Sequence, residues 1–199
     1  MVPIASLWLP ILVAAVVVFV ASSVMHMVLP YHRHDLRRLP DEDGVMEALR
    51  RFNLPPGDYG MPLPASMAGM KSEEFVAKMT AGPVAFITVR PSGPPTMTAS
   101  LLFWFAYALV VSVFVAYVTG RALGPGAAYL AVFRFAGATA FAGYSLALAQ
   151  HSIWYGRRWS TTLTSMFDGL VYALLTAGLF IRNAPPGSPD GAFYDLQEY

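Results

Sequence analysis

The 199-residue chain contains no cysteine, and only 13% of its residues are charged. The lack of cysteine excludes disulfides, iron–sulfur clusters, Cys-ligated zinc and a thiol nucleophile. The net charge of +1 gives no electrostatic basis for nucleic-acid binding. Soluble domains have roughly a quarter of their residues charged, so the low charge and the 56% apolar content are typical of a membrane protein.

The apolar residues form four runs that are long enough to cross a bilayer as helices, which takes about 20 residues. The runs are Leu7 to Leu29, Ala99 to Thr119, Ala127 to Ala149 and Leu163 to Ile181. Backbone groups in lipid must bond within their own segment, so each run is expected to be helical. We therefore predict an all-α membrane protein with four transmembrane helices. Residues 1–29 are the first helix, 30–98 a loop, 99–181 a three-helix region and 182–199 a flexible tail.

Basic residues near the membrane ends predict the orientation, because cytoplasmic loops carry an excess of them. One side has six arginines and the other has two: Arg33, Arg37, Arg38, Arg90, Arg157 and Arg158 against Arg121 and Arg182. The long loop is therefore expected in the cytoplasm of a cell-membrane protein, with both termini outside. Five of these arginines are interpreted as membrane-surface residues near anionic headgroups: Arg33, Arg37, Arg38, Arg157 and Arg158.

The loop is expected to form a small cap on the helical bundle. An amphipathic helix is predicted from Asp41 to Phe52, and a second short helix begins at Ser72 and ends at Gly82. The prolines and glycines between Pro55 and Pro64 predict a segment without regular structure. Val84 to Val89 is interpreted as a short strand, an unpaired hairpin arm or a segment on the membrane.

Arg134 and Asp168 are the strongly ionisable residues within the predicted spans, and such residues usually face the protein interior. Three interpretations stay open. Arg134 extends to the outer surface while Asp168 pairs with Arg157 or Arg158; or Arg134 and Asp168 form a buried pair; or they line a proton or ion path.

Three histidines fall at the predicted cytoplasmic membrane edge, near the level of Asp168: His26, His32 and His151. Imidazoles and a carboxylate are ligands for a metal or a haem. Methionines beside His26, at Met25 and Met27, add thioethers that suit Cu(I). No HxxxH or HxxE spacing supports such a site, and histidine at a membrane boundary also occurs without a ligand. These residues are weak metal candidates, and no cofactor is predicted.

Small residues recur at helical spacing on the third and fourth spans, which permits close backbone approach. They are Ala136, Ala140, Gly143 and Ala147 on the third span, and Gly169, Ala173 and Ala177 on the fourth. The short connection between these spans makes them antiparallel neighbours, so we expect the two stripes to pack together within one chain. A homo-oligomer contact is the alternative.

Parts of the sequence resemble short, uncharacterised bacterial multi-pass membrane proteins. The resemblance rests on the run from Asp168 to Gly178, the stretch from Ser22 to Tyr31, and Gly82-Pro83-Val84. It implies a layout and a bacterial inner membrane. It carries over no activity and no binding residue.

The sequence has no G-x-S-x-G, no H-E-x-x-H and no glycine-rich phosphate loop. We therefore expect a non-catalytic protein that acts as an accessory or assembly subunit of a larger membrane complex, with the bilayer and other membrane proteins as its partners. Two alternatives remain. One is a small homo-oligomeric transporter or channel that uses Asp168 and Arg134. The other is a copper- or haem-handling protein that uses the three histidines.

Overall fold

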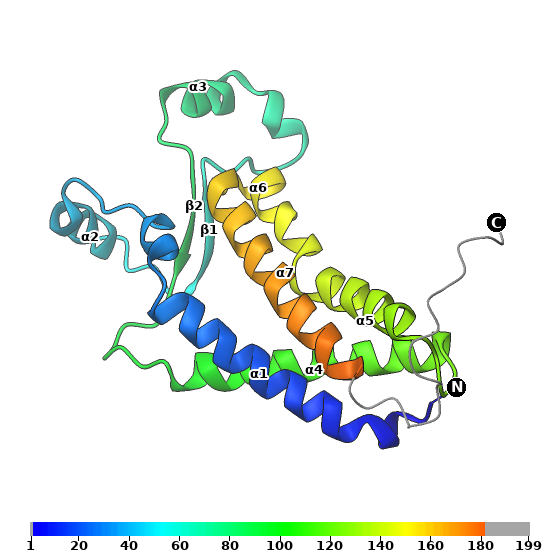
Figure 1. Ribbon diagram of the computed structural model, residues 1–199. Helices are drawn as coiled ribbons and strands as arrows, with labels where there is room; N and C mark the ends of the chain where they lie inside the picture. Colours follow the sequence, from blue (N-terminus) through cyan, green and yellow to red (C-terminus); the bar gives the residue numbers. More distant parts are fainter. Residues whose placement is uncertain (1, 182–199) are drawn as a thin grey trace. The chain divides into compact units, whose positions relative to one another are not determined.

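The computed structural model describes residues 2–181 (Figure 1). These residues divide into two compact units. The first is made of residues 2–35 and 97–181, and the second is Leu36–Thr96. The predicted tail over 182–199 lies outside the described residues.

Within residues 2–181, four helical spans are long and apolar enough to cross a membrane, and all four belong to the first unit. They are α1 (Trp8–Met27), preceded by the 3₁₀ turn η1 (Ile4–Leu7); α4 (Thr98–Ala122); α5 (Tyr129–Tyr144) with α6 (Ala149–Tyr155); and α7 (Trp159–Ile181). The predicted helical architecture is confirmed. By composition and helix length, the chain is a multi-pass membrane protein.

The helices pack in a closed order, α1 against α4, α4 against α5, α5 against α7, and α7 against α1 (Figure 1). The core between them contains many small side chains that are fully buried, among them Ala15, Ala116, Ala136 and Ala177, together with a few large ones such as Tyr172 and Phe180. Larger apolar side chains such as Phe103 point outward and stay exposed. Small residues inside and large apolar residues outside are expected where helices associate in lipid rather than in water.

The third span differs from the predicted continuous helix, because it breaks after Tyr144. Ser145 leaves helical geometry, a 3₁₀ turn follows (η4, Leu146–Leu148), and α6 then continues. Gly169 of α7 lies directly against the break, where a Cβ on it would be 3.0 Å from the Tyr144 carbonyl oxygen. The Ser145 hydroxyl donates to the carbonyl of Met166, 3.0 Å away. The backbone at the break therefore packs directly on α7.

The two predicted small-residue stripes meet only in part. Their buried members between α5 and α7 are Ala136, Ala140, Gly169, Ala173 and Ala177. Two members lie elsewhere, which corrects the expected stripe. Gly143 faces α4, where an added Cβ would lie 3.1 Å from Val111. Ala147 is exposed in the 3₁₀ turn, because the helix that would have carried it inward has already ended.

The second unit contains two short helices and a β-hairpin. Its elements are α2 (Glu42–Arg50), β1 (Gly57–Met61), the 3₁₀ turn η3 (Ala68–Lys71), α3 (Glu73–Ala81) and β2 (Ala85–Val89). Both predicted helices are present. The side chains of Asp41 and Ser72 cap them, and Gly82 ends α3 with a positive φ of 63°.

The hairpin corrects two expectations for this unit. β1 pairs antiparallel with β2, with Gly57 opposite Val89 and Met61 opposite Ala85. The segment rich in proline and glycine was expected to lack regular structure, and this was wrong, because the prolines flank β1 rather than interrupt its ladder. Consequently the strand over residues 85–89 is paired, not a lone arm.

Candidate metal centre

Asp168 on α7 is the centre of a polar cluster within the first unit. Its side chain is only 4% exposed. The hydroxyl of Tyr31 donates to its Oδ1 atom at 2.6 Å. The Nε2 atoms of His32 and His26 lie 3.0 and 3.9 Å from its Oδ2 atom. Two histidines and one carboxylate thus meet at one end of the bundle.

The expected arginine partners of Asp168 are absent from this cluster. Arg134 has an exposed side chain on α5, and it forms no ion pair within residues 2–181. Arg157 donates instead to the Ser165 hydroxyl at 3.4 Å, and Arg158 is exposed. The carboxylate is already enclosed by the segment that follows α1, so an arginine from the α6–α7 connection does not reach it.

The chain after α1 turns sharply and brings the ligands together. His26 lies in the last turn of α1, and its Nδ1 atom is 3.0 Å from the Ser22 carbonyl oxygen. The indole N–H of Trp104 on α4 donates to the Ser22 hydroxyl at 2.7 Å, which ties this turn of α1 to α4. Pro30 then starts the 3₁₀ turn η2 (Pro30–His34), which carries His32 back to α7.

The hydrogen bonds at Nδ1 place a proton on that nitrogen in both imidazoles. A backbone carbonyl only accepts, so the Nδ1 atom of His26 carries the proton that it donates to Ser22. The Nδ1 atom of His32 lies 2.8 Å from Asp35 Oδ2 and donates to that carboxylate in the same way. In neutral imidazoles, each Nε2 atom then presents a lone pair. Both lone pairs belong to the nitrogens that approach Asp168.

The spacing of His32 and Asp168 matches that of two ligands on one metal ion, and His26 lies somewhat farther away. The three ligand atoms of His26, His32 and Asp168 all lie within 4.8 Å of one another. Two ligands bound about 2.1 Å from one ion are separated by about 3.0–3.4 Å, and the distance from His32 to Asp168 is 3.0 Å. The Nε2 atom of His32 is shielded from solvent, and besides its 3.0 Å contact with Asp168 it has no hydrogen-bond partner among the described residues.

His26 would have to move to complete the set. Its ring stacks on that of His32, with centroids 4.2 Å apart and an interplanar angle of 11°. An imidazole binds an ion in its ring plane, so His26 must tilt out of this stack and approach by several tenths of an ångström. Its side chain is 53% exposed, whereas that of His32 is 11% exposed. The ligand that needs to move is therefore the less confined one.

Tyr31 fixes the orientation of the carboxylate. Burial and the hydrogen bond to Asp168 raise the pKa of the Tyr31 phenol above its ordinary value. Tyr31 therefore remains a donor throughout the physiological range, and it occupies Oδ1 while Oδ2 faces the histidines. Sequence reasoning missed both Tyr31 and Asp35. Both residues could have been suspected from their position in the sequence, because they lie within three residues of His32 in the segment that turns back from α1.

The remaining predicted residues lie outside the cluster. His151 is exposed on α6, where the centroid of its ring lies 6.1 Å from that of Tyr155. The arginines expected at the membrane surface are all exposed: Arg33, Arg37, Arg38, Arg157 and Arg158.

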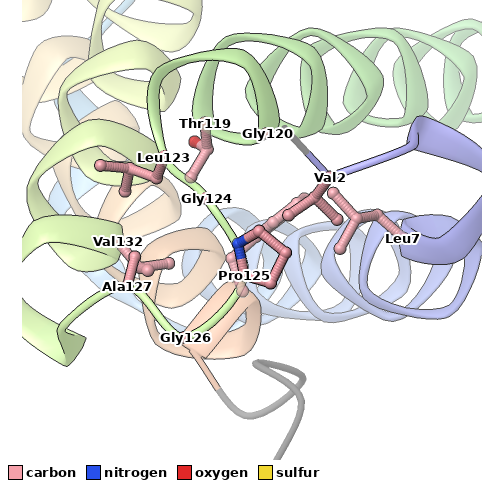
Figure 2. A pocket seen from close by; sticks show the side chains of 11 residues that line it. Val2, Leu7, Thr119, Gly120, Leu123, Gly124, Pro125, Gly126, Ala127 and Val132 are labelled. Atoms are coloured by element: carbon pink, nitrogen blue, oxygen red, sulfur yellow. The ribbon is translucent and has the colours of Figure 1, made fainter.

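A small cavity lies in the first unit at the end of α1 opposite to His26 (Figure 2). Its volume is about 50 Å³, and its lining, including Leu7, Leu123 and Val132, is mostly apolar. The hydroxyl of Thr119 is buried there without a partner. A space of this size holds one or two water molecules. No charged side chain lines it, so it offers nothing to orient a larger ligand.

Comparisons of the chain with protein-family models, curated proteins and solved structures gave no match. The resemblance to bacterial membrane proteins is therefore supported only as far as the multi-pass architecture, which rests on the four long apolar helices.

Proposed function

We propose that this multi-pass membrane protein binds a divalent transition-metal ion at His26, His32 and Asp168. One observation carries the proposal: ligand atoms from α1, η2 and α7 converge on a buried carboxylate, with the imidazole tautomers set for coordination. Lone pairs of two imidazoles and a carboxylate oxygen repel one another unless a positive charge lies between them.

A proton is the simplest alternative source of that charge. A proton on Nε2 of His32 would form an ion pair with Asp168, and it would point along the line between the two atoms. A proton on His32 would satisfy only His32 and Asp168, 3.0 Å apart. A metal ion would also engage the Nε2 atom of His26, which lies 3.9 Å from the same carboxylate oxygen.

The ligand atoms favour an ion such as Zn²⁺, Co²⁺ or Fe²⁺. Two imidazole nitrogens and one carboxylate oxygen are borderline to hard ligands, whereas Cu(I) selects thioethers and thiolates. Met25 is buried among the apolar side chains of the bundle, and Met27 is 78% exposed. Neither belongs to the cluster. The stacked imidazole rings also leave no space for a porphyrin between them, which favours a single ion over haem.

The wider role stays a prediction. We propose that the metal-binding chain is a non-catalytic accessory or assembly subunit of a larger membrane complex. Transport through a path lined by Asp168 and Arg134 is less well supported, because Arg134 is exposed and Asp168 is enclosed by Tyr31 and His32.

Equilibrium metal binding tests the proposed function. The full chain is purified in mild detergent, stripped with a chelator and titrated with Zn²⁺ and Co²⁺. We expect about one ion per chain, and a loss of at least 100-fold in affinity for His32→Ala and for Asp168→Asn. His151→Ala and His34→Ala are matched controls, since both histidines lie outside the cluster, and they should bind as the wild type does.

Circular dichroism and size-exclusion chromatography establish that each variant is folded before its affinity is compared. Binding that survives in His32→Ala, or binding that is lost equally in His151→Ala, contradicts the proposed site. Absence of binding by the folded wild-type chain contradicts the function itself.

A further inference from the structure

The cluster supplies three ligand atoms, which is fewer than the ion requires. Within residues 2–181, His26, His32 and Asp168 make up this group. The neighbouring polar groups are already engaged, since Tyr31 donates to Asp168 Oδ1 and Asp35 accepts from His32. Structural zinc sites are closed by four protein ligands, whereas sites with three keep a position for water or another exchangeable ligand. An ion bound here would have such an open position.

Tyr172 is a buried donor without a partner close to this position. Its side chain is 3% exposed, and its hydroxyl makes no hydrogen bond. The rings of Trp104 and Tyr144 pack against the ring of Tyr172, with centroids 5.8 and 5.6 Å away, so the Tyr172 ring is held in place. Leaving a buried hydroxyl unpaired is unfavourable, because its hydrogen bonds to water are lost and not replaced. An oxygen atom that accepts from it would remove this cost.

The place of Tyr172 on α7 directs that hydroxyl toward the cluster. Tyr172 follows Asp168 by four residues, which puts both on one face of the helix. Long side chains on helices lean back toward the N-terminal turn, here the turn of Asp168.

Solvent reaches the cluster from the side of His26. That side chain is 53% exposed, in contrast to the 4% exposure of Asp168. A small ligand can therefore exchange at the ion without unfolding of the bundle, while the buried side of the ion faces α7.

We propose that the bound ion carries an exchangeable oxygen or nitrogen ligand, water or a small anion, that accepts a hydrogen bond from Tyr172. This inference rests on the proposed metal site. It adds that the site takes a second, exogenous ligand, and it assigns Tyr172 as a positioning residue for that ligand.

Azide binding to the cobalt-loaded chain tests the inference. The visible bands of Co²⁺ report its coordination, so displacement of water by azide changes the spectrum without reference to any activity. We expect a saturable change in the wild type. In Tyr172→Phe, azide affinity should fall about tenfold, the equivalent of one hydrogen bond, while Co²⁺ affinity stays the same. Tyr107→Phe is the matched control, because the Tyr107 hydroxyl donates to the Gly143 carbonyl instead.

Each outcome separates the two proposals. Failure of the wild type to bind Co²⁺ overturns the metal site. Co²⁺ binding with no response to azide leaves the metal site standing and overturns the exchangeable ligand. An equal azide affinity in Tyr172→Phe and wild type overturns the assignment of Tyr172.

Discussion

The hydrogen bond between Asp35 and His32 gives the sharpest quantitative prediction. Asp35 touches no other ligand atom of the site, and its Oδ2 atom accepts from His32 Nδ1 at 2.8 Å. Partners of this kind fix the tautomer and raise the basicity of the ligand, and their loss costs about 10–100-fold in metal affinity. The side chain of Asp35 is 26% exposed, so water weakens the effect of its charge. Asparagine still accepts a hydrogen bond from Nδ1.

We therefore expect Asp35→Asn to weaken Zn²⁺ binding about tenfold, the low end of that range, and Asp35→Ala by up to about 100-fold. Competition with a chromophoric chelator measures both affinities. The unloaded fold of Asp35→Ala should lose about 1–3 kcal/mol, because the buried Nδ1–H of His32 loses its acceptor. Asp43→Asn is the control, because it is the same substitution on the exposed helix α2. Wild-type Zn²⁺ affinity in Asp35→Ala would show that His32 binds the ion without its bond to Asp35, contrary to this prediction.

Three further predictions concern protonation, packing and orientation. The raised pKa of Tyr31 predicts that its stabilising effect is complete below pH 10, the pKa of an exposed tyrosine, and is lost as pH rises through the folded-state value. Alkaline unfolding of Tyr31→Phe should therefore depend less on pH than that of the wild type. Gly169→Ala should destabilise the chain by about 1–3 kcal/mol, because the added Cβ would clash with Ser145, whereas Gly178→Ala, with open space, should be neutral in thermal unfolding. Since the chain has no cysteine, Ser92→Cys should react with an impermeant thiol reagent only from the cytoplasmic side; labelling from outside would reverse the predicted orientation.

The spans and the short helices were predictable, because they depend on signals within each segment. Long apolar runs determine the membrane helices, and Ser72 and Gly82 mark the ends of α3 by local chemistry. The break after Tyr144 and the pairing of β1 were not predictable in this way. Both depend on contacts between distant segments, the first with Gly169 and the second with β2.

The candidate site was predictable in its residue types but not in its grouping. The sequence identified His26, His32 and Asp168, and it placed them near one membrane edge. It also included His151, which the structure places elsewhere, and it proposed arginine partners for Asp168. The sharp turn at Pro30 decides these contacts, because it returns Tyr31 and His32 to α7. No periodic pattern reveals such a turn.

X-ray absorption at the zinc edge of the loaded wild-type chain tests directly whether His26 and His32 bind the ion. We expect two imidazole nitrogens and oxygen ligands about 2.0–2.2 Å from the ion, with one imidazole fewer in His32→Ala. A shell of oxygen atoms alone, or one containing sulfur from methionine, would contradict a metal centre at His26, His32 and Asp168.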